Sequence, residues 1–306
     1  MSVVGRRVKV RVPATTANLG PGFDTLGLAL AFYDELEVEA VSDSSVTVEV
    51  EGVGAGEVPT DGSNLVASSI RYVFDRVKQP VPGLKLHARN SIPHGRGMGS
   101  SGSAIVSGIK AAQGLLEGTV NFSDDELLAL ATELEGHPDN VAPALFGGLT
   151  VAWTTEAGPR FKKLNVHRGV SPLVLVPDFK MSTELARSLQ PESVPHEDAV
   201  FNVSRSALLV AALTQSPELL FEATEDRLHQ DYRASAMPET SAVIGALRSA
   251  GFAAVVSGAG PSILVLCSDP SERLRATEVA RSAYTSTWTE LMLTVDIKGA
   301  TVGAVV

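Results

Sequence analysis

The segment Pro93–Ser103 constrains this chain more than any other part of the sequence. Four of its eleven residues are glycines, and it ends in a run of serines. The preceding residues Leu84–Ala88 alternate between apolar and polar, as in a strand, whereas Ser100–Leu116 repeats apolar residues at helical spacing. The first turn of a helix carries unpaired N–H groups and a partial positive charge, so it is a natural binding site for phosphate. The sequence therefore predicts a phosphate-binding loop between a strand and a helix, with an ordinary glycine-rich connection as the alternative.

Three common phosphate and hydrolase motifs do not fit this segment. Gly97, Gly99 and Gly102 match the spacing of the dinucleotide fingerprint, but they lie about a third of the way along the chain instead of in the first βα unit. No lysine follows the glycines, which excludes a Walker A loop, and the serines do not form Gly-x-Ser-x-Gly. A less common nucleotide loop remains, in which the hydroxyls of Ser100 and Ser101 bind phosphate oxygens or a bound Mg²⁺.

Strand and helix patterns alternate along the rest of the chain, which favours an α+β or α/β protein. The strand Val8–Val12 is expected to end at Pro13, and the segment that follows it, Asn18–Gly22, reads as a loop. Further strands are expected at 36–39, 46–50, 173–176, 253–257 and 263–266, and further helices at 64–77, 124–134, 183–190, 199–213 and 239–250. Gly158 and Pro159 provide a domain boundary, so we expect an N-terminal domain over 1–157 and a C-terminal domain over 158–306.

Composition excludes several classes of partner. The chain of 306 residues has a formal net charge of −10 and a pI of about 5.1, which disfavours nucleic acid and anionic membrane surfaces. No stretch approaches the roughly 18 apolar residues of a membrane span, and the N-terminus lacks the apolar core of a signal peptide. The single cysteine, Cys267, excludes an internal disulfide and is expected to be a buried, inert thiol. A cytoplasmic protein is therefore expected.

Three segments together resemble the GHMP kinases, the family of galactokinase, homoserine kinase, mevalonate kinase and phosphomevalonate kinase. Pro93–Ser101 is similar to the ATP-phosphate motif of that family, Pro13–Asp24 to its N-terminal substrate motif, and Ser257–Ser262 to its C-terminal glycine-rich motif. They occur in the family's order and span almost the whole chain. Within the family, the residue sequences of Ala17–Gly27 and Glu133–Pro143 resemble those of the members that phosphorylate homoserine. The stretches 201–205 and 226–233 resemble the actinobacterial ones.

The resemblance implies a two-part α+β fold and a reaction. The GHMP kinase fold has a ribosomal protein S5-like N-terminal domain, which holds the phosphate loop, and a ferredoxin-like C-terminal domain. The implied reaction transfers the γ-phosphoryl group of ATP, with Mg²⁺, to the side-chain hydroxyl of L-homoserine, and a homodimer is a family expectation. Phosphorylation of another alcohol such as mevalonate, a binding protein without activity and an NAD-dependent enzyme are the alternatives.

The resemblance also assigns the nucleotide and metal contacts. Ser101 and Glu133 are the expected Mg²⁺ ligands, with Glu135 as a competitor for the carboxylate role. Asn64 aligns with a contact on the adenine side, although N-capping of its own helix explains it equally well. The expected ATP contacts are Asn64, Pro93, His94, Gly95, Arg96, Gly97, Met98, Gly99, Ser100, Ser101, Gly102 and Ser103.

A zwitterionic substrate requires an anion for its ammonium group and a planar pair of donors for its carboxylate. Asp24 fits the first requirement, and arginine fits the second. The expected substrate contacts are Asn18, Asp24, His137, Asp139, Arg187 and Arg233. Asn140 is expected to position the attacking hydroxyl in a reaction without a dedicated base. The alternative makes Asp139 that base, in which case Asp139→Asn would lower kcat many thousandfold.

Overall fold

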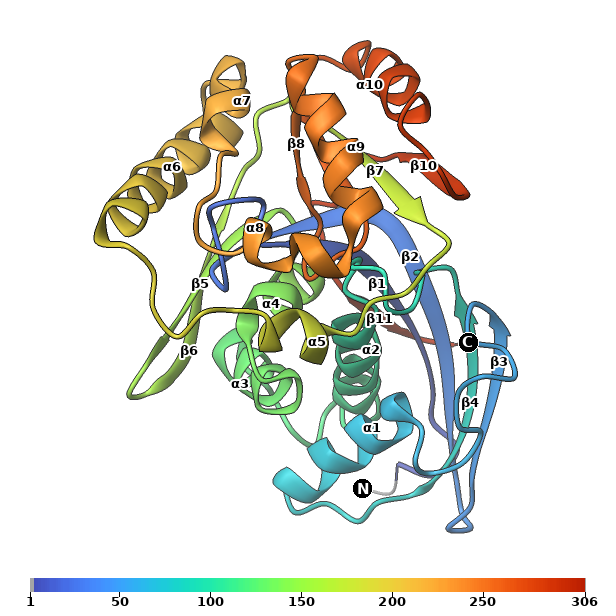
Figure 1. Cartoon of the computed structure of the whole chain (residues 1–306). Helices are drawn as coiled ribbons and strands as arrows, with labels where there is room; N and C mark the ends of the chain where they lie inside the picture. Colours follow the sequence, from blue (N-terminus) through green and yellow to red (C-terminus); the bar gives the residue numbers. More distant parts are fainter. Residues whose placement is uncertain (1–2, 306) are drawn as a thin grey trace.

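Two β-sheets carry the fold of this protein (Figure 1), and a computed structural model describes residues 3–305 of it. The larger sheet has the order β11-β1-β2-β4-β3, and β5 pairs with both β2 and β6. Its strands are β1 (Arg7–Ala17), β2 (Leu26–Val41), β3 (Val46–Gly52), β4 (Gly83–Asn90), β5 (Leu149–Thr155), β6 (Gly158–Leu164) and β11 (Thr301–Ala304). The smaller sheet has the order β10-β7-β9-β8, formed by β7 (Ser171–Pro177), β8 (Ala253–Val256), β9 (Ile263–Cys267) and β10 (Trp288–Met292). All pairings are antiparallel except that of β3 with β4.

The helices divide between the two sheets. Those packed with the larger sheet are α1 (Leu65–Arg76), α2 (Ser100–Leu115), α3 (Asp124–Glu135) and α4 (Pro138–Phe146). Those of the second half are α5 (Thr183–Ser188), α6 (His196–Thr214), α7 (Leu220–Ala223), α8 (Gln230–Arg233), α9 (Pro238–Ser249) and α10 (Glu272–Arg281). No helix within residues 3–305 combines the length and the apolar character that a bilayer crossing requires.

The first strand does not end at Pro13, as the sequence predicts, but continues to Ala17. The register between β1 and β2 shifts between Pro13 and Ala14, which marks a bulge. Proline has no N–H to donate to a ladder and is tolerated at such irregularities. The strand then runs, fully buried, into the loop that begins at Asn18.

The boundary expected at residue 158 does not separate the two sheets. It falls in the turn between β5 and β6, whose residues pair from Leu149–Leu164 to Thr155–Gly158. The last strand, β11, also returns to pair with β1. The chain thus crosses between the halves more than once, and a division into 1–157 and 158–306 stays a prediction.

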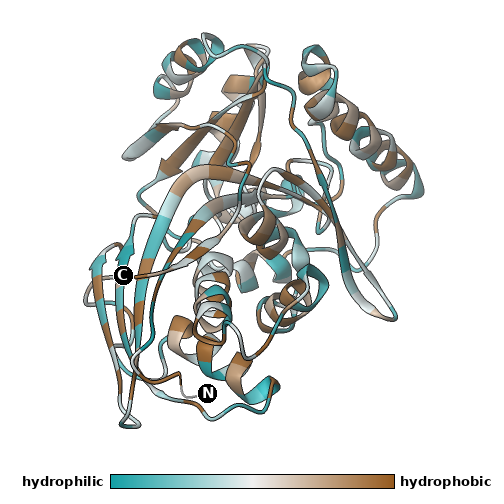
Figure 2. Ribbon diagram, turned by 180° about the vertical axis from the view of Figure 1, so that it is seen from behind, coloured by the Kyte–Doolittle hydropathy of each residue, from teal (hydrophilic) through white to brown (hydrophobic). Residues whose placement is uncertain are grey.

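Apolar side chains form separate clusters on the two sides of each sheet. One cluster lies between the larger sheet and α1–α4, and includes Phe74, Ile105 and Ile109. A second fills the space between the sheets, and a third lies between the smaller sheet, α9 and α10. The strand β7 is buried at every residue, and the smaller sheet is brown along most of its length in Figure 2, as expected for a sheet covered on both faces. Cys267 belongs to the third cluster, where burial raises the pKa of its thiol to about 12. The prediction of a buried cysteine is confirmed.

Candidate active site

The three segments that resemble motifs of the GHMP kinases meet at one cavity of about 160 Å³. It lies where the β1–β2 loop, the start of α2, the α3–α4 junction, α5, α8 and the β8–β9 loop converge. Its lining residues are Asn18, Asp24, Gly95, Arg96, Gly97, Gly99, Ser100, Ser101, Glu135, His137, Asp139, Asn140, Met181, Ser182, Thr183, Arg187, Arg233, Gly258, Ala259 and Gly260. Residues far apart in the sequence therefore share one site, and all the expected substrate contacts are among them.

The predicted phosphate loop has the backbone geometry of an anion site. Gly95, Gly97 and Gly99 have φ values of 65°, 72° and 70°, a region that residues with a Cβ adopt at a cost. Gly99 is the N-cap of α2, and the first intrahelical bond runs from the Ser103 N–H to the Gly99 carbonyl at 2.8 Å. The N–H groups that precede this bond belong to the helix start that borders the cavity, and the first turn contains no acidic side chain. An anion placed there meets backbone donors and the positive end of the helix dipole.

The carboxylate beside Ser101 is Glu135 and not Glu133. The Ser101 hydroxyl donates to Glu135 Oε2 at 2.8 Å, and both side chains line the cavity. Glu133 lies outside it, where it accepts from the Tyr72 hydroxyl and pairs with Arg76 at 3.4 Å. Glu133 is three residues from the C-cap Gly136 and faces α1, whereas Glu135 is the last residue of α3 and faces α2. The structure thus does not bring the expected ligand Glu133 to Ser101 and brings its competitor instead.

Opposite charges face each other on the substrate side of the cavity. The Arg187 guanidinium donates to both oxygens of Asp24, at 3.0 and 3.3 Å. The Asn18 side chain accepts from the Asp24 N–H at 2.9 Å and donates to the Gly258 carbonyl at 2.9 Å, which fixes the loop. Arg233 is only 2% exposed, and its Nε and Nη1 have no hydrogen-bond partner. Burial, together with the nearby Arg187, lowers the pKa of Arg233.

His137, Asp139 and Asn140 lie at the start of α4, a helix that the sequence patterns did not predict. His137 is the N-cap of α4, and its Nδ1 is hydrogen-bonded to the buried Asp139 carboxylate. Burial disfavours the imidazolium, but the bond and charge of Asp139 outweigh this effect, so the pKa of His137 is raised. Asn140 Oδ1 accepts from the Thr15 hydroxyl of β1 at 2.9 Å, so its side-chain amide is held in a fixed orientation.

A second hollow of about 230 Å³ adjoins the first at Ser100 and Ser101. Its other walls are mostly apolar side chains of β2–β4 and the start of α1, including Leu36, Val48 and Leu86. Asn64 lines this hollow, but its side chain accepts from the Val66 N–H at 2.9 Å and donates to the Pro59 carbonyl at 2.8 Å. The bond to Val66 is the N-cap bond of α1, so the capping explanation for Asn64 is confirmed, and the second bond ties Asn64 to the preceding loop.

The remaining residues of the phosphate loop fall into two groups. Gly95, Arg96 and Gly97 line the first cavity, and His94 lines the second. The Arg96 guanidinium points away from any anion at the helix start, since it donates to the carbonyls of His94, Pro177 and Asp178 at 2.6–2.9 Å.

The other four residues border neither hollow. Met98, Gly102 and Ser103 are buried, and Pro93 is half-buried at the entry to the loop. These four residues shape the loop and pack beneath it.

Sequence reasoning missed a buried carboxylate beneath this loop. Asp34 is 8% exposed, and its Oδ1 accepts from the N–H groups of Ser91 and Ile92 at 2.7 and 2.9 Å. Burial raises the pKa of Asp34, although these bonds oppose the shift. Asp34 lies in the long strand β2, on the face that carries the buried residues Leu36, Val38 and Ala40. A charged residue at a core-facing position of the alternation was the signal that could have found it. The same reasoning gave no role to Gly258–Gly260, although it identified that segment as part of a family motif.

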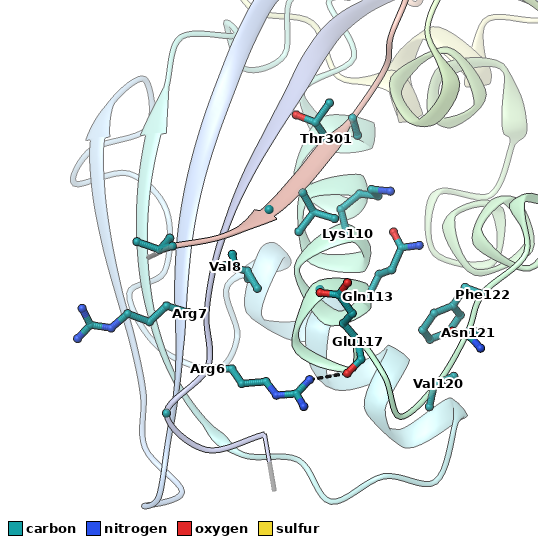
Figure 3. A pocket seen from close by; sticks show the side chains of 17 residues that line it. Arg6, Arg7, Val8, Lys110, Gln113, Glu117, Val120, Asn121, Phe122 and Thr301 are labelled. Carbon is teal, nitrogen blue, oxygen red and sulfur yellow. Dashed lines mark hydrogen bonds between the residues drawn. The ribbon is translucent and has the colours of Figure 1, made fainter. Parts of the chain in front are cut away.

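A larger hollow lies elsewhere in the molecule. It has a volume of about 870 Å³ and lies between β11, the start of β1 and the C-terminal part of α2 (Figure 3). Arg6 at its rim donates to the carbonyls of Leu115 and Glu117, and none of the expected site residues lines it. Size therefore does not identify the site here, whereas the convergence of charged groups at the smaller cavity does.

Comparisons with known proteins agree with this geometry. Residues 64–148 match the model of the GHMP kinases N terminal domain, and residues 207–286 match that of the GHMP kinases C terminal. The homoserine kinase of Clavibacter michiganensis subsp. michiganensis is 70% identical over 98% of this chain and 95% of its own length. The chain belongs to the homoserine kinase family of the GHMP kinases.

Other members of the family show the same coverage. The homoserine kinase of Streptomyces avermitilis is 49% identical over 96% of this chain and 95% of its own length. The crystal structure of homoserine kinase from Cytophaga hutchinsonii superposes with a TM-score of 0.87 at 26% identity, over 99% of both chains. The predicted family, the α+β GHMP kinase fold and the use of ATP that a kinase of this family implies are thereby confirmed.

Proposed function

We propose that this protein transfers the γ-phosphoryl group of ATP to the side-chain hydroxyl of L-homoserine and releases ADP and O-phospho-L-homoserine. One observation carries the proposal beyond the family relationship. A single cavity contains an anion-binding helix start, an aspartate for an ammonium group and a buried arginine with open donors for a carboxylate. Mevalonate carries a carboxylate but no ammonium group, so it would leave Asp24 without a ligand charge to bind.

ATP fits across the two adjoining hollows. The apolar hollow between β2–β4 and α1 suits the adenine base, and the start of α2 suits the phosphates, with Ser100 and Ser101 at the junction. Phosphoryl transfer requires charge neutralisation and in-line positioning more than covalent chemistry by the protein. The backbone donors of the glycine-rich loop meet the first requirement without rearrangement.

The residues present also fit Mg²⁺. The metal prefers hard oxygen ligands and keeps several waters, so one hydroxyl, one carboxylate and the substrate phosphates suffice. Ser101 and Glu135 supply that hydroxyl and carboxylate 2.8 Å apart at the edge of the helix start. No cluster of three or more His, Cys, Asp or Glu that could hold a metal occurs within residues 3–305, which agrees with a site completed by phosphate oxygens. When bound, the ion neutralises negative charge on the transferred phosphoryl group.

The chain's own side chains orient the amino acid. In this proposal Arg233 and Arg187 bind the carboxylate and Asp24 binds the ammonium group, while the hydroxyl points toward the residues of α4 that line the cavity. Asn140, fixed by Thr15, is the hydroxyl's positioning partner. Asp139 is hydrogen-bonded to His137, and we assign it to substrate orientation in a reaction without a dedicated base.

An assay of ADP release with L-homoserine, mevalonate, galactose and L-threonine tests the proposal. Turnover should be highest with L-homoserine, and the product should carry phosphate on its side-chain oxygen. Efficient turnover of mevalonate without turnover of L-homoserine would refute the assignment. A cytoplasmic location and a homodimer stay predictions, which cell fractionation and analytical ultracentrifugation of the purified protein test.

A further inference from the structure

Two of the charges assigned to the amino acid neutralise each other in the free protein. Arg187 donates to Asp24 through both Nη atoms, and the two side chains are 41% and 39% exposed. Arg233 differs, because it is buried and two of its donors have no partner. It stacks over the ring of Phe23 at 5.2 Å, and that ring in turn stacks on His229 at 4.9 Å. The free site therefore offers one fixed, open cation and one closed ion pair.

We propose that the zwitterionic substrate is selected by charge exchange, in which its two charged groups replace the Asp24–Arg187 ion pair as a unit. This inference rests on the proposed function and deepens it. The carboxylate first meets the open donors of Arg233 and then attracts Arg187, while the ammonium group takes the oxygens of Asp24 that Arg187 vacates. One ion pair is broken and three are formed, and none of these charges is left without a partner.

A ligand with a single charge cannot complete this exchange. A carboxylate without an ammonium group either leaves Arg187 on Asp24 or strips Asp24 of its partner. An ammonium group without a carboxylate frees Arg187 beside Arg233, where two like charges remain uncompensated. Leaving a charge unpaired in a desolvated site is far more costly than losing an exposed ion pair. The two charges of the substrate must therefore act cooperatively and not independently.

Four alcohols measure this cooperativity without any change to the protein. L-Homoserine carries both charges, 4-hydroxybutanoate lacks the ammonium group, 3-aminopropan-1-ol lacks the carboxylate, and propan-1-ol lacks both. Multiplying kcat/KM for L-homoserine by that for propan-1-ol, and dividing by the product for the other two, gives a coupling factor. Charge exchange predicts a factor of about ten or more, since leaving a charge unpaired costs more than 1.4 kcal/mol. A factor near one means independent recognition and overturns the proposal.

The variant Asp24→Asn provides a second test, in which the loss of a charged group should strengthen the binding of one ligand. In Asp24→Asn, Arg187 has lost its partner and is available from the start, so 4-hydroxybutanoate should bind about tenfold more tightly than to the wild type. L-Homoserine should bind more weakly. The matched control is Asp139→Asn, which also removes a carboxylate from the cavity, but one that is bonded to His137 instead of Arg187. Isothermal titration calorimetry of 4-hydroxybutanoate with the three proteins, saturated with a non-hydrolysable ATP analogue, makes the comparison.

The outcomes separate this inference from the proposed function. Equal gains in affinity for 4-hydroxybutanoate in Asp24→Asn and Asp139→Asn would show a general effect of net charge and would overturn the charge exchange. An unchanged affinity in Asp24→Asn would overturn it as well. In both cases L-homoserine would still be the substrate of the wild type. If no phosphorylation of L-homoserine is found in the wild type, the proposed function itself fails. Thermal melting of each variant confirms that a loss of binding does not come from unfolding.

Discussion

Replacing Glu135 by Gln tests which carboxylate serves the phosphoryl transfer. The change keeps the size of the side chain and its ability to accept from the Ser101 hydroxyl, which lies 2.8 Å away, but removes the negative charge. A hydrogen bond to a charged group contributes about 1.5–3 kcal/mol. Losing one stabilising group at a site where charge develops costs about 10²–10³ in rate. We therefore expect kcat/KM to fall about 10²–10³-fold in Glu135→Gln.

The matched control is Glu133→Gln, two residues earlier on the same helix. Glu133 is 48% exposed, and its ion pair with Arg76 joins two solvated side chains. Exposed pairs of this kind contribute at most about 1 kcal/mol. The control should therefore keep kcat/KM within about fivefold of the wild type, with a small loss of thermal stability.

A Mg²⁺ titration of the ADP-release rate, at saturating ATP and L-homoserine, distinguishes a ligand from a merely structural residue. The Mg²⁺ concentration for half-maximal rate should rise in Glu135→Gln and stay unchanged in Glu133→Gln. The opposite pattern, with a severe loss of kcat/KM in Glu133→Gln and a mild one in Glu135→Gln, would show that Glu133 and not Glu135 serves the phosphoryl transfer.

Three further predictions concern stability and the amino-acid subsite. Arg233→Met should raise KM for L-homoserine at least about thirtyfold while the melting temperature stays equal or rises, because a buried cation with open donors is removed; a lower melting temperature would indicate a structural role. Gly97→Ala places a Cβ against the Ser257 carbonyl oxygen, so it should lose more stability in urea unfolding than Gly118→Ala, which has a similar φ of 74° but open space. Burial opposes ionisation of Glu239, but donors from Thr285, Trp288 and Ser286 outweigh it and lower its pKa from 4.5 to about 2. Glu239→Gln should therefore cost about 1–3 kcal/mol at pH 7, and the gap should narrow as the pH falls below 4.5, where the unfolded carboxyl takes up the proton first; a gap that does not change with pH would contradict this.

Local periodicity predicted most of the elements whose own residues carry a clear helical or strand pattern. The helices α1 and α3 and the strand β7 lie where the sequence places them, within a few residues at each end. Two of the misses concern strands whose pairing partners decide where they lie. The end of β1 depends on a bulge against β2, and β11 is a strand because β1 offers it an edge. The short segment Thr301–Ala304 has no strong pattern of its own to indicate this.

The sequence predicted which residues belong to the candidate site, but not which way their side chains point. The family motifs gave Ser101, Asp24, Arg187 and Arg233, and the structure places all four around one cavity. The choice between Glu133 and Glu135 depends on a rotation of about 200° around the helix axis, since each residue turns the helix by about 100°. A match between motif sequences does not contain that information.

Contacts between the three glycine-rich segments explain why the motifs had to be found together. Ser257 Oγ lies 2.6 Å from the Gly97 carbonyl oxygen and 2.9 Å from Thr16 Oγ1, and the Gly258 N–H donates to the Ala17 carbonyl at 3.1 Å. Each of these contacts joins segments that lie far apart in the chain, and two of them use backbone atoms, whose partners do not depend on side-chain chemistry. The phosphate loop therefore takes its shape from the β8–β9 loop as much as from its own glycines. A substitution in the β8–β9 loop should therefore disturb the phosphate loop, although the β8–β9 loop belongs to the smaller sheet.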